Sequence, residues 1–103
     1  MCTYDTQHLR VSGSGKGAQG WFSLSTGTVY YDHPVHAFAD HTLNIDFAAP
    51  DQGAGARVAV ELTAETAVGL VSAIADALLC APASLTGLSS AQLQALRAVS
   101  ATP

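Results

Sequence analysis

The spacing of apolar residues changes at Thr63, and this change constrains the fold more than any other feature of the 103-residue chain. Before Thr63, Val58, Val60 and Leu62 occupy every second position, as in a pleated strand. After it, one helical face carries apolar residues three or four positions apart, at Ala67, Leu70, Val71, Ile74 and Leu78. Strands followed by helices predict an α+β fold, and we expect a single domain over residues 1–103.

Period-two alternation predicts about four strands, near residues 3–12, 21–32, 38–47 and 57–62. The glycine-rich segment 13–20 is expected to be a flexible connection. Two helices follow, at about 64–79 and from Ser89 or Ser90 to 100, with Thr63 capping the first and Pro82 stopping it. The sheet should be mainly antiparallel, and the first helix should pack on it.

Charge is scarce: 49% of the residues are hydrophobic, 12% are charged, and the net charge is −4. Four scattered cations cannot form the basic stripe that nucleic-acid binding needs.

The longest apolar run, 67–80, is interrupted by Ser72 and Asp76 and is too short to span a membrane. The chain opens with no secretory pattern, so we expect a cytoplasmic protein. So few charges leave apolar surface exposed on a small monomer, which favours a homodimer.

A glycine-rich segment, residues 15–20, matches the pattern GxGxxG. A dinucleotide site needs a helix directly after that pattern, whereas residues 21–29 are typical of a strand. A plain connection is the simplest interpretation. Alternatively, Lys16 lies near a pocket and recruits an anionic group of a substrate.

Histidine placement is the most informative functional signal. Three of the four histidines fall within nine residues, at His33, His36 and His41. Neutral imidazole is the commonest protein ligand for zinc, iron and copper. A hairpin around residues 34–39 would bring His33 and His41 together, with His36 at its tip. Ordinary hydrogen bonds to the adjacent aspartates are the structural alternative.

Two further side chains are candidate ligands of the same site. His8 lies on the polar face of the first expected strand, and Cys2 lies six residues upstream of it. Cys2 is equally open to a role as a nucleophile or as a partly buried thiol. Zinc is the expected metal, with iron or copper second, because imidazole does not discriminate strongly among them.

Other polar residues are candidates for catalysis beside the metal. Tyr31, or Tyr30, could donate a phenolic proton, although aromatic packing is the usual role. Asp46 should point away from His41, as an exposed carboxylate or one that supports the site, with a role as a base or a ligand as the alternative. Glu61, between Val60 and Leu62, is most simply a solvated strand residue.

Several segments resemble a family of small bacterial proteins of unknown function that is common in high-GC actinomycetes. They are the opening Met-Cys-Thr-Tyr, GKGAxGW at 15–21, DHPVH at 32–36 and LNIDF at 43–47. The resemblance extends from Cys2 to about Ala77, and its pattern includes the positions of Cys2, His8, Lys16, His33, His36 and His41. It implies that these residues form one site, but the family has no established activity. Its source suggests a role in specialised metabolism.

The leading hypothesis is a metal-dependent enzyme of the hydrolase, lyase or isomerase type, acting on a small metabolite. A second hypothesis is a non-catalytic homodimeric module that binds a ligand or metal at the histidines. A third is a metal-free enzyme that uses histidine for acid–base catalysis. All three require the same residues, so the sequence alone does not separate them.

Overall fold

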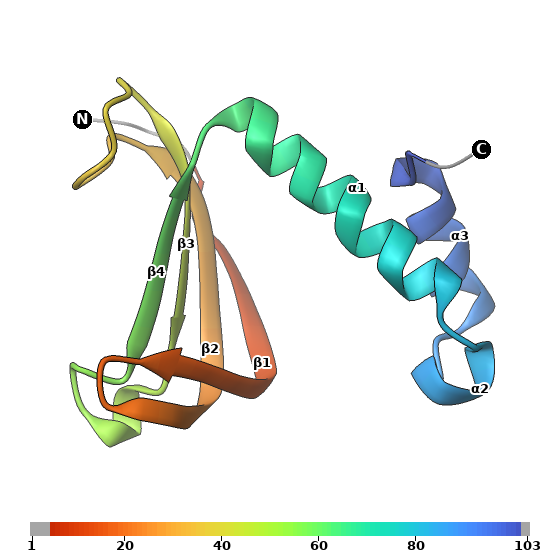
Figure 1. The fold of residues 1–103 in the computed structure, drawn as a ribbon, viewed down its shortest axis with the longest axis horizontal. Helices are drawn as coiled ribbons and strands as arrows, with labels where there is room; N and C mark the ends of the chain where they lie inside the picture. Colours follow the sequence, from red (N-terminus) through yellow and green to blue (C-terminus); the bar gives the residue numbers. More distant parts are fainter. Residues whose placement is uncertain (1–4, 102–103) are drawn as a thin grey trace. The chain divides into compact units, whose positions relative to one another are not determined.

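Four antiparallel strands, adjacent in chain order, form the sheet of this protein in a computed structural model that describes residues 5–101 (Figure 1). They are β1 (Gln7–Gly17), β2 (Gly20–Asp32), β3 (Thr42–Ala48) and β4 (Arg57–Leu62). The strands belong to one compact unit, Met1–Ala64, and the helices to a second, Glu65–Pro103. A four-stranded antiparallel sheet followed by helices confirms the predicted α+β class.

The β1–β2 hairpin is longer than the sequence predicted. Residues 13–17 pair with β2 as part of β1, so the expectation of a flexible connection is wrong there. The register shifts between Arg10 and Gly13, and such a bulge bends a strand. A Cβ added at Gly15 would lie 3.1 Å from Cγ2 of Val58 in β4. The end of the hairpin therefore folds across the sheet, as Figure 1 shows.

The sheet has one apolar and one polar face. Cross-strand neighbours share a face. One row of the apolar face consists of Val29, Ile45 and Val60. The adjacent row of the polar face consists of Tyr30, Asn44 and Glu61. This alternation follows directly from the period-two pattern of the sequence.

Residues 33–41 connect β2 to β3 and contain no strand. The expected third strand therefore begins at Thr42 rather than near Phe38, and ends at Ala48. The physical reason is that several backbone N–H groups of the connection donate to a side chain of β4 instead of a neighbouring strand. A 3-10 turn, Pro50–Gln52, lies in the next connection, between β3 and β4.

The helical unit contains α1 (Ala64–Cys80), α2 (Ala83–Thr86) and α3 (Ser90–Val99). Helix α1 begins directly after Thr63 and ends before Pro82, as predicted. The single-turn helix α2 is an element that the apolar spacing of the sequence did not predict. No helix among residues 5–101 is long and apolar enough to cross a membrane.

Helix α3 begins with a capping box, which confirms Ser89 as its N-cap. The backbone N–H of Gln92 donates to Oγ of Ser89 over 3.1 Å, and the N–H of Ser89 donates to Oε1 of Gln92 over 2.8 Å. These two bonds satisfy backbone donors that the first helical turn leaves without intrahelical partners.

We predict that Thr42→Val destabilises the chain by about 1–3 kcal/mol in denaturant unfolding, because it leaves a buried acceptor without its donor. Thr42 is fully buried, and its hydroxyl donates to Oδ1 of the buried Asn44 over 2.6 Å. Thr26→Val is the matched control: this exposed threonine donates to the carbonyl of Ala48 over 3.4 Å. Its effect should stay within about 0.5 kcal/mol. Equal losses in the two variants would contradict this assignment.

Candidate metal centre

Glu61 on β4 anchors the 33–41 connection. Its carboxylate accepts backbone N–H bonds from Val35 at 2.5 Å, from Ala37 at 2.9 Å and from His36 at 3.1 Å. These bonds hold the middle of the connection against the polar face of the sheet. The expectation that Glu61 is a solvated strand residue is therefore wrong, because alternation predicts its face but not what covers that face.

The three-bond contact lowers the pKa of Glu61. The largest causes are the bonds from the N–H groups of Val35 and Ala37, which favour the ionised carboxylate over the neutral acid. Partial desolvation acts in the opposite direction and is outweighed. The carboxylate is consequently ionised at neutral pH, and its two oxygens can then accept all three N–H bonds.

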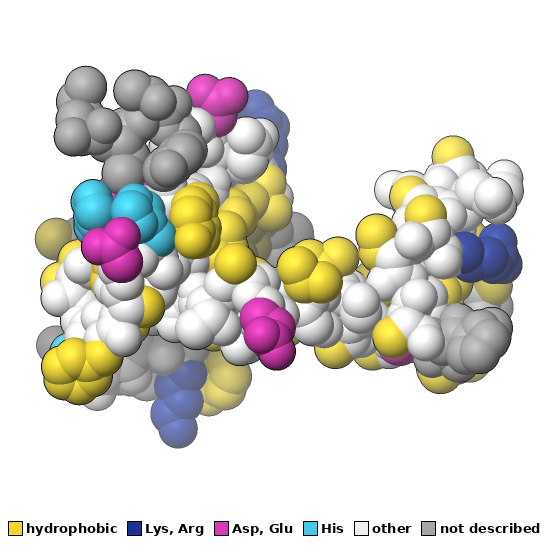
Figure 2. Space-filling view, turned by 90° about the horizontal axis from the view of Figure 1, so that it is seen from above, with side chains coloured by type: hydrophobic (Ala, Val, Ile, Leu, Met, Phe, Trp, Pro, Cys, Tyr) yellow, Lys and Arg dark blue, Asp and Glu magenta, His cyan; other side chains and the backbone are white. Residues whose placement is uncertain are grey.

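His33 and His41 lie side by side where β2 ends and β3 begins. Their ring centroids are 4.3 Å apart, with the planes tilted by 36°. Asp40 bonds to both rings: its backbone oxygen lies 2.9 Å from Nδ1 of His33, and its Oδ2 lies 2.8 Å from Nδ1 of His41. Figure 2 shows histidine side chains gathered at one place on the surface, with an acidic side chain against them.

These bonds fix the tautomers of the two neutral rings. A carbonyl or carboxylate oxygen only accepts a hydrogen bond, so Nδ1 of His33 and of His41 must carry the proton. The lone pair of each neutral ring is then on Nε2. A hydrogen bond from one ring nitrogen to a carboxylate or a backbone carbonyl is the usual arrangement of metal-ligating histidine.

A potential ligand atom from each of His33, Asp40 and His41 lies within 4.8 Å of the others. The group is open to solvent: the side chain of Asp40 is 89% exposed and that of His41 is 23% exposed. With both Nδ1 atoms bonded to Asp40, the two Nε2 atoms are the nitrogen ligands that the site offers to zinc, and the further coordination positions are left for water or substrate. The residues present therefore fit a metal ion.

Tyr31, the predicted phenolic donor, stacks on His41. Their ring centroids are 5.6 Å apart and their planes differ by 19°. The Tyr31 ring lies on the apolar face of the sheet, and its stacking there limits how the His41 imidazole can rotate. Tyr31 is thus next to the centre, in contact with one of its candidate ligands.

A pocket of about 510 Å³ adjoins the histidines on the polar face. His33 belongs to both the pocket and the metal group, and the other polar lining residues include Tyr30, His36, Asn44, Arg57 and Glu61. The volume falls within the range of about 300–1,000 Å³ that small-molecule sites occupy. A molecule in this pocket would lie against one of the two imidazoles.

Asp46 links two other side chains in the same pocket. Its Oδ1 accepts from Nε and Nη2 of Arg57 at 3.0 and 2.6 Å, and its Oδ2 accepts from the Tyr30 hydroxyl at 3.2 Å. Burial, followed by the negative charge of Asp46, raises the pKa of Tyr30. Tyr30 therefore remains a protonated donor at neutral pH, and Asp46 is held as an ion-pair partner.

The other predicted site residues lie apart from the histidine pair. His36 lines the pocket but is not in the metal group, and His8 is exposed on β1, opposite Thr28. Lys16 is exposed opposite Trp21 at the start of β2, whereas His33 follows the end of that strand. Cys2 lies outside the described residues. The structure therefore brings His33 and His41 together and places Lys16 at the opposite end of the sheet.

The roles of Asp40 and Glu61 were not predicted from the sequence. The adjacency of Asp40 and His41 signalled a hydrogen bond but not that one residue holds both rings. Glu61 carried no local signal, because its partners are 24 to 26 positions away in the chain.

The chain belongs to a Family of unknown function (DUF6295), which it matches over residues 1–87. No curated protein and no solved structure matches the chain. The matched range includes the whole sheet, the 33–41 connection and α1.

We predict that Glu61→Gln accelerates amide hydrogen exchange at Val35, His36 and Ala37. The substituted carboxamide retains one acceptor oxygen and places an NH₂ group where the second oxygen accepts, so the contact cannot keep all three bonds. The matched control is Glu65→Gln, on α1, which should leave these three amides unchanged. Unaltered exchange in Glu61→Gln would show that the carboxylate does not hold the connection.

The same contact should depend on pH. The pKa of Glu61 in the folded chain lies below its ordinary value of 4.5, so the stabilisation it provides is fully present above that pH. It is lost as the pH falls through the lowered pKa. Amide chemical shifts of residues 35–37, followed by NMR during acidification, should show a transition below pH 4.5 that is absent from Glu61→Gln. A transition that persists in the variant would assign it to another group.

Proposed function

We propose that this chain is a metal-dependent enzyme whose centre is formed by His33, His41 and Asp40. The observation that carries the proposal is the pair of hydrogen bonds that Asp40 accepts from the Nδ1 atoms of both rings. These bonds set the tautomer in which both Nε2 atoms are ligands. Zinc is the metal we propose first, and iron or copper second.

Asp40 is a positioning residue in this proposal, because its carboxylate is engaged at Nδ1 of His41, on the opposite side of the ring from Nε2. Its carboxylate orients the ring of His41, and its carbonyl orients the ring of His33. The remaining coordination positions belong to water or substrate. His8, His36 and Cys2 are not required, although Cys2 remains a candidate for a further ligand.

The pocket beside His33 is the substrate site we propose. A bound metal there would polarise a carbonyl group or activate water, which supports hydrolase, lyase or isomerase chemistry. The Tyr30 hydroxyl, which donates its proton to Asp46, offers an acceptor oxygen, and Arg57 retains N–H donors beyond the two that Asp46 uses. A small polar metabolite fits this lining. The actinomycete source that the motifs suggest would place it in specialised metabolism.

We further propose that the chain acts as a homodimer. Val35 and Phe38, on the connection that carries the histidines, are 98% and 107% exposed. A second copy covering these side chains would remove apolar surface from water and shield the metal centre. Light scattering should then give twice the mass of one chain, and Phe38→Ser should shift the equilibrium towards monomer.

Asp40 and His41 also support a metal-free alternative. A carboxylate 2.8 Å from Nδ1 of histidine orients the ring as a general base through Nε2. In that case chelators would leave activity unchanged. A non-catalytic module would instead bind metal or ligand stoichiometrically and give no turnover.

Zinc titration by calorimetry tests the proposed centre. We expect one zinc per wild-type chain. Loss of a residue that only hydrogen-bonds to a ligating histidine weakens metal binding by about 10–100-fold. Because the double variant His33→Ala/His41→Ala removes the ligands themselves, it should weaken zinc binding by more than this. His8→Ala and His36→Ala are matched controls and should bind like the wild type. Wild-type affinity in the His33/His41 double variant would overturn the proposal.

Asp40→Asn tests the positioning role separately. The carboxamide is a poorer acceptor for Nδ1 of His41, so we expect zinc affinity to fall by about 10–100-fold without loss of folding. Asp51→Asn, in the 3-10 turn, makes the same change at a residue outside the metal group and is the control. Equal affinities for the two variants would remove Asp40 from the centre.

A further inference from the structure

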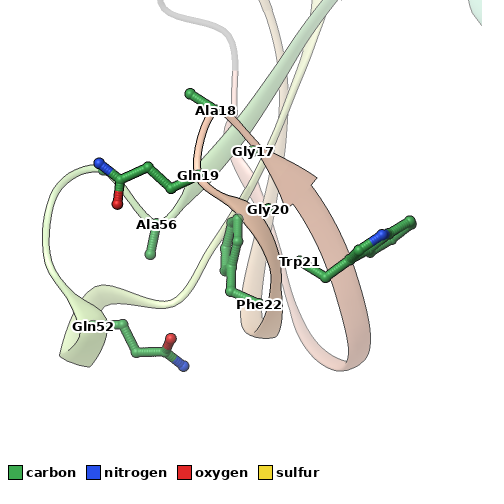
Figure 3. Close-up of a pocket in the computed structure, with 9 residues that line it drawn as sticks. Gly17, Ala18, Gln19, Gly20, Trp21, Phe22, Gln52 and Ala56 are labelled. Carbon is green, nitrogen blue, oxygen red and sulfur yellow. The ribbon is translucent and has the colours of Figure 1, made fainter.

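A second hollow lies at the opposite end of the sheet from the histidines. It has a volume of about 500 Å³ and is formed where the β1–β2 turn faces the β3–β4 connection. Figure 3 shows the Phe22 ring and the Gln52 side chain pointing into it, with the Ala56 methyl group between the two loops. Trp21 points to the other side of the hairpin.

Backbone hydrogen bonds hold the rim of this hollow in place. In the β3–β4 connection, the N–H of Ala49 donates to the carbonyl of Ala56, and that of Gln52 donates to the carbonyl of Ala49, both over 2.9 Å. On the hairpin side, a Cβ added at Gly17 would lie 3.2 Å from the Phe22 ring, so the ring packs against this glycine. The hollow is therefore bordered by ordered elements rather than loose loops.

Among the described residues that line the hollow, none has an ionisable side chain. Lys16 pairs with Trp21 and shares its side of the hairpin, away from Phe22. A charged ligand would lose water here without gaining an opposite charge, which is unfavourable. The lining consequently selects for a neutral molecule.

The polar groups at this site are the carboxamides of Gln19 and Gln52 and the peptide groups of three glycines. Each carboxamide both donates and accepts hydrogen bonds, as a hydroxyl group does. The Phe22 ring adds a flat apolar wall. We infer that this hollow binds a neutral, hydroxyl-rich ring, a pyranose sugar, with its C–H face against Phe22 and its hydroxyl groups towards Gln19 and Gln52.

The test is an NMR titration of the full chain with methyl glucoside, galactoside and mannoside. At least one pyranoside should shift amides within residues 17–22 and 52–56, with a dissociation constant on the order of 1 mM for a ligand this small. Glucuronate and glucosamine, which carry a charge on the same ring, should bind more weakly. The absence of shifts at about 50 mM, well above that constant, would overturn the inference.

Gly55→Leu is the decisive variant. Gly55 lines the hollow, and no atom lies within 4 Å of a Cβ added there, so a leucine can be introduced without a clash and narrows the hollow. Pyranoside binding should be lost, whereas the control Gly69→Leu, at a glycine with equally open space but outside the hollow, should retain it. Gln52→Ala should weaken binding about 2–10-fold, the equivalent of one hydrogen bond.

The His33/His41 double variant should bind pyranosides normally, which separates this inference from the metal centre. Pyranoside binding that survives Gly55→Leu, or charged analogues that bind as tightly as neutral ones, would each contradict the inference.

Discussion

The contact between the Glu61 carboxylate and three consecutive backbone N–H groups is the interaction on which the histidine-bearing end of the sheet depends. Residues 33–41 form no strand, so their backbone donors need other partners. One carboxylate on β4 supplies these partners for residues 35–37. The connection is thereby fixed at its middle, and its two ends place His33 and His41 beside each other.

Asp40 then converts a pair of neighbouring histidines into a defined donor set. Two imidazoles in contact at a surface are compatible with many roles. The carbonyl and the carboxylate of one residue orient both rings, and the lone pairs of the neutral rings lie on Nε2. Tyr31 stacks on the ring of His41, and the Tyr30–Asp46–Arg57 cluster lines the adjoining pocket, so both tyrosine candidates lie close to the proposed centre.

Local patterns in the sequence predicted much of this arrangement. Alternation in β2 and β3 indicated the two faces, and its continuation through His33 and His41 indicated that a hairpin would bring these residues together. The start of α1 after Thr63 and the cap at Ser89 followed from helix-end chemistry. Each of these signals depends on residues close together in the chain.

Features that depend on distant residues were not predicted. The role of Glu61 requires knowing that residues 35–37 lie over β4, and strand alternation carries no such information. The glycine-rich segment 13–17 looks flexible by composition, yet cross-strand pairing holds it in β1. Its curvature arises from a bulge and from glycine's close approach to Val58, which are tertiary effects.

The most direct test of the metal centre is diffraction at the zinc absorption edge, with crystals of the wild-type chain grown with one equivalent of zinc. The proposed centre predicts a single anomalous peak about 2.0–2.1 Å from Nε2 of both His33 and His41, the normal zinc–nitrogen distance. A peak held by other residues, or no peak between the two rings, would contradict it.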